Sequence, residues 1–220
     1  MKRNQSGFTL IEIAIVLVII GLLLGGVLKG QELINSARVK NLAGDFKNIP
    51  VFVYGYQDKF RALPGDDINA TSHVGATDNG DGNGVIGGTW FSTSSADESF
   101  KFWQHVRLAG LAPGPTSLTD PNYLPTNAAG GTIGFQSGTS VAGNAPIKDL
   151  SATPVAIRGT YVICSSGILG KYVKQLDTTM DDSNTATGSM MATAASGVGA
   201  SATATGSIDE AATYTVCMGI

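Results

Sequence analysis

The sequence predicts an α+β protein in which one long N-terminal helix packs on a small antiparallel β-sheet. Two observations predict this class. An apolar run over residues 8–28 continues into a helical stripe that extends toward residue 62. The later part of the chain is rich in Gly, Ser, Thr, Ala and Asn and holds short strand-like runs between turn residues. A chain of 220 residues is enough for one globular domain with an accessory segment.

Residues 1–7 form a short, polar and basic leader ahead of the apolar run. Residues 8–28 carry a single charged side chain, Glu12, and are long enough to span a bilayer as a helix, which needs about 20 residues. Because Lys2 and Arg3 precede this run, the positive-inside rule keeps the N-terminus in the cytoplasm and sends the rest of the chain across the membrane. No Ala-x-Ala site follows the run cleanly, so an ordinary secretory signal is not indicated.

Residues 29–62 are expected to form the soluble half of the same helix. Its apolar side chains recur at spacings of four and three, which places them on one face that another part of the protein must cover. These side chains are Leu42, Phe46, Ile49, Val53, Tyr56 and Phe60. Gly25, Gly26 and Pro50 should bend the helix, and Pro64 should end it.

Residues 63–220 are expected to form the globular domain. Ser95 and Glu98 have the spacing of a capping box, which predicts a short helix that stops at Gly110. Strands of an antiparallel sheet are predicted over residues 132–136, 155–158, 160–164 and 213–218. Residues 184–207 consist almost wholly of Ala, Thr, Ser, Gly and Met and are predicted to form a mobile loop, because they bury too little apolar surface.

The chain contains two cysteines, Cys164 and Cys217, each inside a strand-like run. In a domain outside the cytosol, such a pair predicts one disulfide. The alternative is a pair of buried, reduced thiols, because small cysteine side chains pack well in protein cores.

A candidate calcium loop follows the long helix. Asp78, Asp81 and Asn83 offer oxygen ligands at nearby positions, and Gly84 permits a sharp turn. The bidentate glutamate of a complete calcium loop is missing at the expected distance, so the shell would be closed by other carboxylates, namely Asp66, Asp67, Asp97 or Glu98. The alternative is a solvated Asn/Gly/Asp turn. No pattern requires a cofactor, and calcium is the one candidate.

Composition and motifs argue against a nucleic-acid-binding protein and against an enzyme. The formal net charge is −3, and no Lys/Arg-rich run follows the first helix, so the basic footprint of a nucleic-acid binder is missing. The sequence contains no serine nucleophile motif in a strand-to-helix context and no glycine loop followed by Lys-Ser/Thr. His73 and His105 have no partner at metal-like spacing and are interpreted as structural or surface residues.

Residues 7–12 read Gly-Phe-Thr-Leu-Ile-Glu and lead directly into the apolar helix. This motif resembles the class III leader of type IV prepilins and type II secretion pseudopilins. The resemblance implies that a prepilin peptidase cleaves between Gly7 and Phe8 and methylates the new amine of Phe8. It also implies that Glu12 pairs with the amine of a neighbouring subunit during assembly, and that Pro50 kinks the helix. A carboxylate is costly inside a bilayer, which agrees with a function for Glu12, although a carboxylate near the headgroups can also be merely tolerated.

The function implied by the resemblance is that of a structural filament subunit in a type IV pilus or a secretion pseudopilus. Its partners would be other pilin or pseudopilin subunits, the prepilin peptidase, an inner-membrane assembly platform and, before assembly, membrane lipid. The location would be the bacterial inner membrane, single-pass with a cytoplasmic N-terminus, and after assembly a periplasmic pseudopilus or a cell-surface pilus. The alternatives are a membrane-anchored periplasmic binding domain and a filament-tip adhesin. A cleavage site on the cytoplasmic side of the helix favours a filament subunit over a simple anchor.

Overall fold

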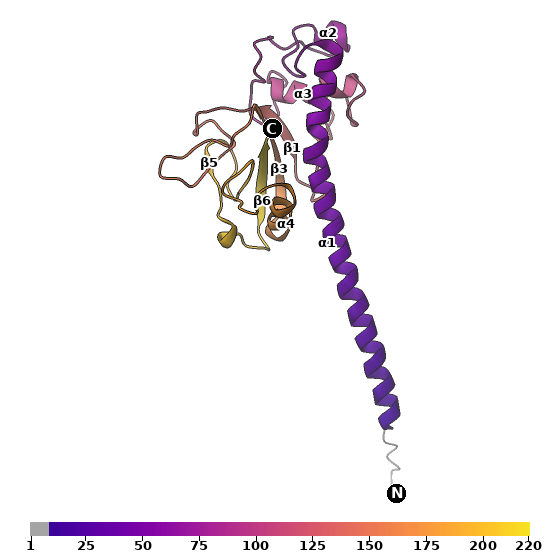
Figure 1. Ribbon diagram of the computed structural model, residues 1–220. Helices are drawn as coiled ribbons and strands as arrows, with labels where there is room; N and C mark the ends of the chain where they lie inside the picture. Colours follow the sequence, from indigo (N-terminus) through magenta and orange to yellow (C-terminus); the bar gives the residue numbers. More distant parts are fainter. Residues whose placement is uncertain (1–8) are drawn as a thin grey trace. The chain divides into compact units, whose positions relative to one another are not determined.

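The computed structural model describes residues 9–220 of the chain. It divides the chain into two compact units, one that ends at Arg38 and a second that comprises Val39–Ile220. Helix α1 (Leu10–Phe60) contributes residues to both units, and a small antiparallel sheet lies in the second (Figure 1). The predicted α+β class, with a long N-terminal helix ahead of a small antiparallel sheet, is confirmed.

In the first unit, residues 10–28 of α1 are apolar on all sides except at Glu12. The helix contains a segment long and apolar enough to cross a membrane, with a mean hydropathy of 2.8, and none of that segment is buried within the protein. The helix passes through Gly25 and Gly26 without interruption. An α-helix that is apolar all round is stable only when another apolar phase surrounds it, either lipid or other protein.

In the second unit, α1 buries only one face. Its buried side chains are Val39, Leu42, Ala43, Phe46, Ile49, Val53 and Tyr56. The predicted stripe is therefore buried except at Phe60, which is half-buried. Pro50 lies inside the helix, which continues to Phe60, and the predicted bend at Pro50 stays a prediction. The chain then leaves the helix at Arg61, which has a left-handed φ of 57°.

The sheet consists of four antiparallel strands in the order β1-β3-β6-β4 (Figure 1). The strands are β1 (Ile133–Ser137), β3 (Tyr161–Leu169), β4 (Met190–Thr193) and β6 (Thr213–Gly219). Cys164 on β3 lies directly opposite Cys217 on β6, and the two side chains form a disulfide across the centre of the sheet.

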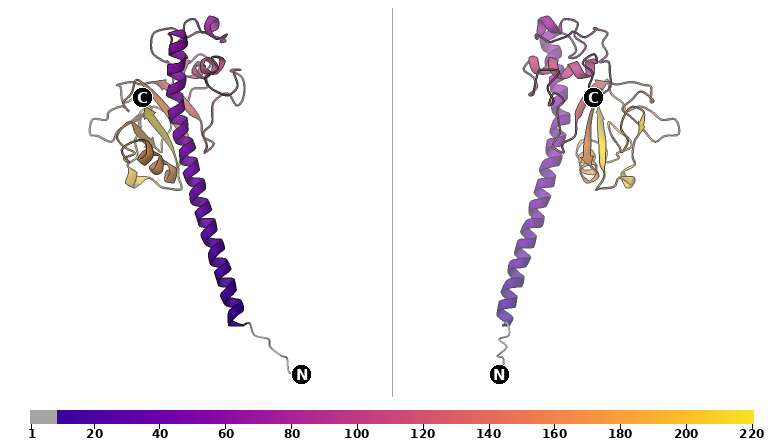
Figure 2. Two further views of the ribbon diagram at one scale, coloured as in Figure 1. Left: turned by 45° about the vertical axis from the view of Figure 1, so that its right-hand side comes forward. Right: turned by 180° about the vertical axis from the view of Figure 1, so that it is seen from behind.

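Both faces of the sheet are buried. Ile163 and Val216 point into the same core as Phe46 of α1, together with side chains of α3 (Glu98–Leu108) and α4 (Gly170–Met180). Val162 and the disulfide point to the opposite face, where a second cluster includes Ile147. Ile147 belongs to a small parallel pair, β2 (Ile147–Lys148) and β5 (Ala200–Ser201). Figure 2 shows α4 beside the four-stranded sheet in two further views. Because both faces are covered, β3 is apolar at the successive positions 161–164, and β4 is apolar at the successive positions 190–192. Two short elements, α2 (Ala70–His73) and the 3₁₀-helix Thr205–Ser207, complete the fold.

The predicted capping box of α3 is wrong. The helix begins at Glu98 with Asp97 as its N-cap, later in the chain than a Ser95 cap requires. Glu98 is buried and accepts hydrogen bonds from the backbone N–H groups of Asp81 and Gly87. Its carboxylate is therefore committed to the preceding loop and does not fold back on the helix start.

Two predictions in the C-terminal half are also wrong. Residues 155–158 form no strand, since Ala156 makes only an isolated bridge to Lys148 while covering the second face of the sheet. Residues 184–207, predicted to be a mobile loop, contain β4, whose backbone pairs with β6. The composition of this segment did not predict a strand, because most of its residues are small or polar. The strand is held by Met190 and Met191, which bury their side chains on opposite faces of the sheet.

Candidate functional site

Glu12 lies in the first turn of α1, where it takes part in a capping box with Thr9. The Thr9 backbone N–H and the Thr9 hydroxyl each donate a 2.8 Å hydrogen bond to Oε2 of Glu12. The Glu12 N–H donates in return to Oγ1 of Thr9 at 3.3 Å. This reciprocal pattern satisfies donors at the helix start that have no partner within the helix. Within residues 9–220, Oε1 of Glu12 accepts none of these bonds and stays open to a further partner.

The surface around Glu12 is apolar and exposed. Ile11 and Ile13 flank it in sequence, and exposed apolar side chains continue along α1 as far as Ile34. Such a surface is far larger than the apolar patches that monomeric soluble proteins expose. Glu12 is the only acidic group along this part of the described helix before Glu32. The predicted cleavage and methylation positions, Gly7 and Phe8, lie outside the described residues.

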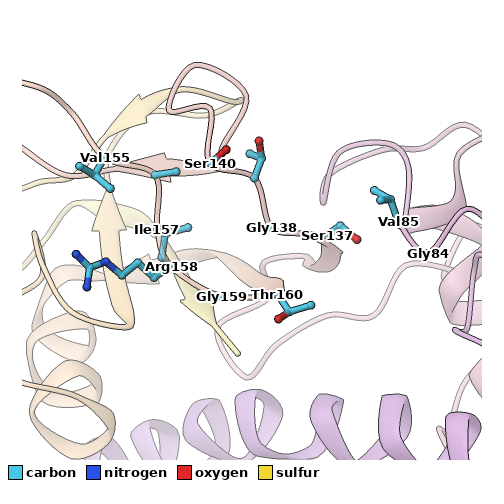
Figure 3. A pocket seen from close by; sticks show the side chains of 12 residues that line it. Gly84, Val85, Ser137, Gly138, Ser140, Val155, Ile157, Arg158, Gly159 and Thr160 are labelled. Atoms are coloured by element: carbon cyan, nitrogen blue, oxygen red, sulfur yellow. The ribbon is translucent and has the colours of Figure 1, made fainter.

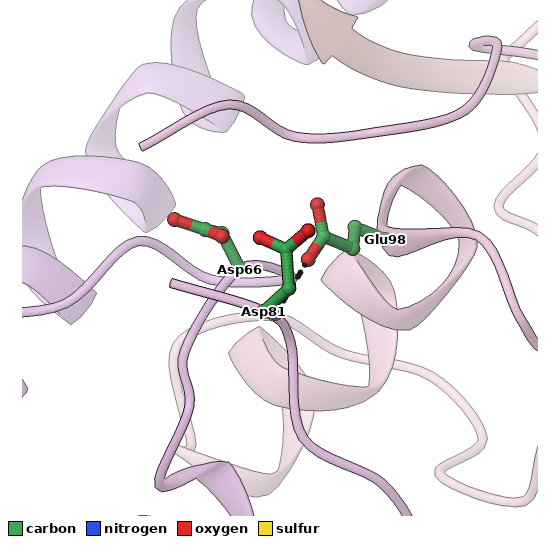
Figure 4. Close-up of side chains that lie close together, drawn as sticks. All are labelled: Asp66, Asp81 and Glu98. Carbon is green, nitrogen blue, oxygen red and sulfur yellow. Dashed lines mark hydrogen bonds between the residues drawn. The ribbon is translucent and has the colours of Figure 1, made fainter. Parts of the chain in front are cut away.

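A second candidate site lies in the globular unit, where three carboxylates converge. One carboxylate oxygen from each of Asp66, Asp81 and Glu98 lies within 4.8 Å of the others (Figure 4). Asp66 and Glu98 are buried and Asp81 is exposed, so the cluster opens to solvent on the Asp81 side. Figure 4 shows the carboxylates of Asp81 and Glu98 facing each other, with the Asp66 side chain on the opposite side of Asp81.

The buried carboxylates of this cluster are held by the loop itself. Asp66 accepts hydrogen bonds from the N–H groups of Asn83 (3.0 Å) and Gly84 (2.9 Å). Glu98 accepts from the N–H groups of Asp81 (2.9 Å) and Gly87 (2.8 Å). Burial raises the pKa of Asp66, while the bond from Gly84 lowers it and the contact with Asp81 raises it further. Three acids at this spacing repel one another, and a cation or a proton relieves that repulsion.

Of the other residues predicted for the calcium loop, Asn83 adjoins the cluster, where its side-chain amide donates a 2.8 Å hydrogen bond to Asp81. Asp78 contacts a different residue, since its backbone carbonyl lies 3.3 Å from Nε2 of His105. Asp67 accepts from the Tyr56 hydroxyl, and Asp97 accepts from the Ser92 hydroxyl. Asp81, Asp66 and Glu98 are thus the carboxylates that the fold brings together.

His105 is a buried structural residue of α3. Its Nδ1 accepts a 2.9 Å hydrogen bond from the N–H of Gly65, which leaves Nε2 to donate toward the Asp78 carbonyl. Its ring also stacks on that of Tyr56 with centroids 6.2 Å apart. Burial lowers the pKa of His105 to about 4, so the ring is neutral at physiological pH. The histidine therefore fixes the turn that delivers Asp66 to the acidic cluster.

A surface hollow beside the end of β1 offers little reactive chemistry. Its volume is about 530 Å³, and it lies between residues 84–85, 137–140 and 155–160 (Figure 3). Arg158 is the one titratable side chain among the residues that line it. General acid–base catalysis needs at least a second positioned group, so this hollow carries no argument for a reaction.

Residues 2–28 match the model of the prokaryotic N-terminal methylation motif. This motif is the leader signature of type IV pilins and pseudopilins, and the chain therefore carries the signature of a pilin-like or pseudopilin precursor anchored in a membrane. The long helix and small antiparallel sheet are consistent with a pilin-like fold. No curated protein and no solved structure matches the chain.

The structure adds residues that the sequence interpretation missed. Thr9 and Glu12 have the Thr-x-x-Glu spacing of a capping box, so this contact could have been expected from the sequence. Asp66 and Glu98 were two of the four carboxylates expected to close the shell around Asp81. That these two approach Asp81 depends on the turn at Gly65 and the start of α3, which no local pattern shows.

Proposed function

We propose that this protein is a structural subunit of a type IV pilus-like or type II secretion pseudopilus filament. The observation that carries the proposal is the coincidence of the methylation motif, residues 2–28, with a helix whose apolar surface no other described part of the chain covers. A prepilin peptidase would remove the leader and methylate the new amine of Phe8. The helix would rest in membrane lipid before assembly and pack against other copies, or related subunits, afterwards.

Glu12 supplies the specific contact of this proposal. Its Oε2 is engaged by Thr9, while Oε1 stays available to the N-terminal amine of a neighbouring subunit. Opposite charges attract most strongly where the dielectric constant is low, as at the edge of a hydrocarbon layer. The globular unit, with its own core and disulfide, would form the outer surface of the filament and would not depend on Glu12.

The test replaces Glu12 and uses Glu32 as a matched control on the same helix. Glu32 is also exposed and forms a 2.6 Å ion pair with Lys29. We expect Glu12→Ala to reduce incorporation into sheared filaments at least about tenfold, since losing one ion pair in a low-dielectric setting is worth more than about 1.4 kcal/mol. Leader cleavage and the disulfide should be unchanged, Glu12→Asp should be intermediate, and Glu32→Ala should assemble normally. Normal assembly of Glu12→Ala would contradict this role of Glu12 and would favour the alternative function, a membrane-anchored periplasmic binding domain.

We also propose that the loop around Asp81 binds calcium through Asp66, Asp81 and Glu98. The support is the convergence of three oxygen donors at a spacing that a calcium ion bridges. A bound ion would fasten the segment after α1 to the start of α3. Calcium would act there as a structural ligand and not as a reagent.

A further inference from the structure

A different acidic cluster lies at the C-terminal end of α4. Asp177 is in the last turn of the helix, Asp181 is its C-cap residue, and Asp182 follows. One carboxylate oxygen from each of the three lies within 4.8 Å of the others. The C-terminal end of a helix presents backbone carbonyls and the negative end of the helix dipole, so three carboxylates there meet an environment that already favours positive charge.

Asp177 is unlike the other two acids because it is buried without a partner. Its side chain is 1% exposed, and within the described residues neither of its carboxylate oxygens has a hydrogen-bond partner. Buried polar atoms are almost always satisfied, and a buried carboxylate without donors is especially unfavourable. The neighbouring side chains in the cluster, Asp181 and Asp182, are also hydrogen-bond acceptors. Within residues 9–220, no donor therefore satisfies the buried Asp177 carboxylate.

Asp181 and Asp182 are held in place by donors on their outer sides. Asp181 accepts a 2.7 Å hydrogen bond from the N–H of Met190 and one of 3.0 Å from the Ser189 hydroxyl. Asp182 accepts from the N–H of Asn184 at 2.8 Å and from the Thr187 hydroxyl at 3.1 Å. Each of these carboxylates keeps lone pairs for a further ligand. The loop therefore positions two carboxylates against the unpartnered one.

The electrostatics of the cluster also call for a positive ligand. Burial, and after it the charges of Asp182 and Asp181, raise the pKa of Asp177 to about 7. A carboxyl group in this setting either keeps a proton or is matched by a cation. All donors are carboxylate oxygens, which is the donor set of hard divalent ions.

The chemistry of the donors favours calcium over magnesium. Calcium accepts about six to eight oxygen ligands at about 2.3 to 2.6 Å in a flexible arrangement, whereas magnesium requires a near-octahedral shell at about 2.0 to 2.1 Å and keeps several of its waters. The carboxylate oxygens of the cluster all lie within 4.8 Å of one another, so one calcium ion can contact all three.

The geometry points to a calcium site at the C-terminal end of α4, formed by Asp177, Asp181 and Asp182. The ion satisfies the buried Asp177 carboxylate and joins α4 to the start of β4, because Asp181 also binds the Met190 N–H. β4 pairs with β6, and Met191 lies opposite the disulfide residue Cys217. Calcium therefore fastens the edge strand of the sheet to the helix that precedes it.

The experiment measures calcium binding by calorimetry on the detergent-solubilised full chain after treatment with a chelator. Asp177→Asn should bind one fewer calcium ion per chain than the wild type. Asp182→Asn, at an exposed position that leaves the core intact, should weaken binding at this site about tenfold. Asp58→Asn, an exposed acid on α1, should bind calcium as the wild type does. Magnesium at equal concentration should give at least tenfold weaker binding.

Asp81→Asn separates this site from the cluster around Asp66, because it should leave binding at Asp177 unchanged. Unchanged calcium stoichiometry and affinity in both Asp177→Asn and Asp182→Asn would overturn the proposal. It would also be overturned if Asp177→Asn melted higher than the wild type at every calcium concentration, since Asp177 would then be a protonated carboxyl group that needs no metal.

Discussion

The two stretches of α1 have the same secondary structure and opposite surroundings. Up to Arg38 the helix buries none of its most apolar segment within the protein, whereas from Val39 onward it buries a stripe against the sheet. The difference lies in the sequence pattern, since residues 10–28 are apolar on all sides except at Glu12, whereas the stretch from Val39 is apolar on one face. The first stretch thus relies on lipid or other subunits, and the second relies on the chain itself. One helix can therefore serve assembly and folding with separate sets of residues.

The largest expected effect compares one apolar residue from each stretch. Phe46 is 1% exposed and Leu17 is 64% exposed. Phe46→Ala should lower the free energy of unfolding by about 3 to 5 kcal/mol, because it removes a large buried ring and leaves a cavity. Leu17→Ala should leave the unfolding of the globular unit unchanged. Denaturant unfolding of the detergent-solubilised chain, followed by the fluorescence of the buried Trp90 and Trp103, measures both.

An equal loss of stability in the two variants would contradict the separation of the two stretches. The amount of filament formed is the complementary measurement, since Leu17→Ala should reduce assembly without changing the stability of the globular unit. A small effect of Phe46→Ala would show that the core around α1 closes over the cavity.

A smaller loss of stability should appear on acidification, and it should come from the second unit, which contains His105. His105 gains a proton near pH 6.5 in the unfolded chain and only near pH 4 in the folded one, because burial lowers its pKa. The unfolded state therefore binds more protons between these values, and stability falls as the pH falls. At pH 5 this loss should reach about 2 kcal/mol relative to pH 7.

His105→Asn isolates this contribution. Asp45 and Asp177, whose pKa values burial raises to about 6 and about 7, act in the opposite direction, because the folded state then holds the extra proton. The informative quantity is accordingly the difference between the wild type and the variant across pH 7 to 4. A parallel pH dependence in the two proteins would show that His105 does not titrate as its burial requires.

Much of the fold could be predicted from local patterns. The stripe from Leu42 to Tyr56, the strands that carry Cys164 and Cys217, and the disulfide itself follow from periodicity and residue type. Glu12 stood out because a single charge in a long apolar run is unusual.

The remainder depends on contacts between distant segments. Strand β4 lies in a stretch rich in Ala, Thr, Ser, Gly and Met, and it forms because β6 offers a pairing edge and the core accepts Met190. Helix α4 was not predicted, although Tyr172, Val173 and Leu176 recur at helical spacing and are buried. Glu98 was assigned to a helix cap because its sequence spacing does not show that its carboxylate bonds to the N–H groups of the loop around Asp81. The sequence named Asp66 and Glu98 among four candidate partners of Asp81, and the fold shows which of them converge.

The smallest expected effect concerns calcium at the cluster of Asp66, Asp81 and Glu98, which lies wholly in the second unit. Calcium at about ten times its dissociation constant should stabilise the folded unit by about 1.4 kcal/mol. For a unit of this size, that raises the melting temperature by about 3 to 6 °C. Asp81→Asn should abolish this cluster's share of the rise, because it removes the exposed carboxylate that would complete the ion's shell.

The control is the same variant measured in chelator and in calcium. In chelator, Asp81→Asn should be at least as stable as the wild type, because it removes a negative charge beside Asp66, whose pKa burial raises. In calcium, it should be less stable than the wild type. This crossing of the two stabilities distinguishes a lost ligand from a damaged loop, since damage would lower the melting temperature in both conditions. If Asp81→Asn kept the full calcium response, the cluster would be a solvated turn, and any remaining response would come from the site at Asp177.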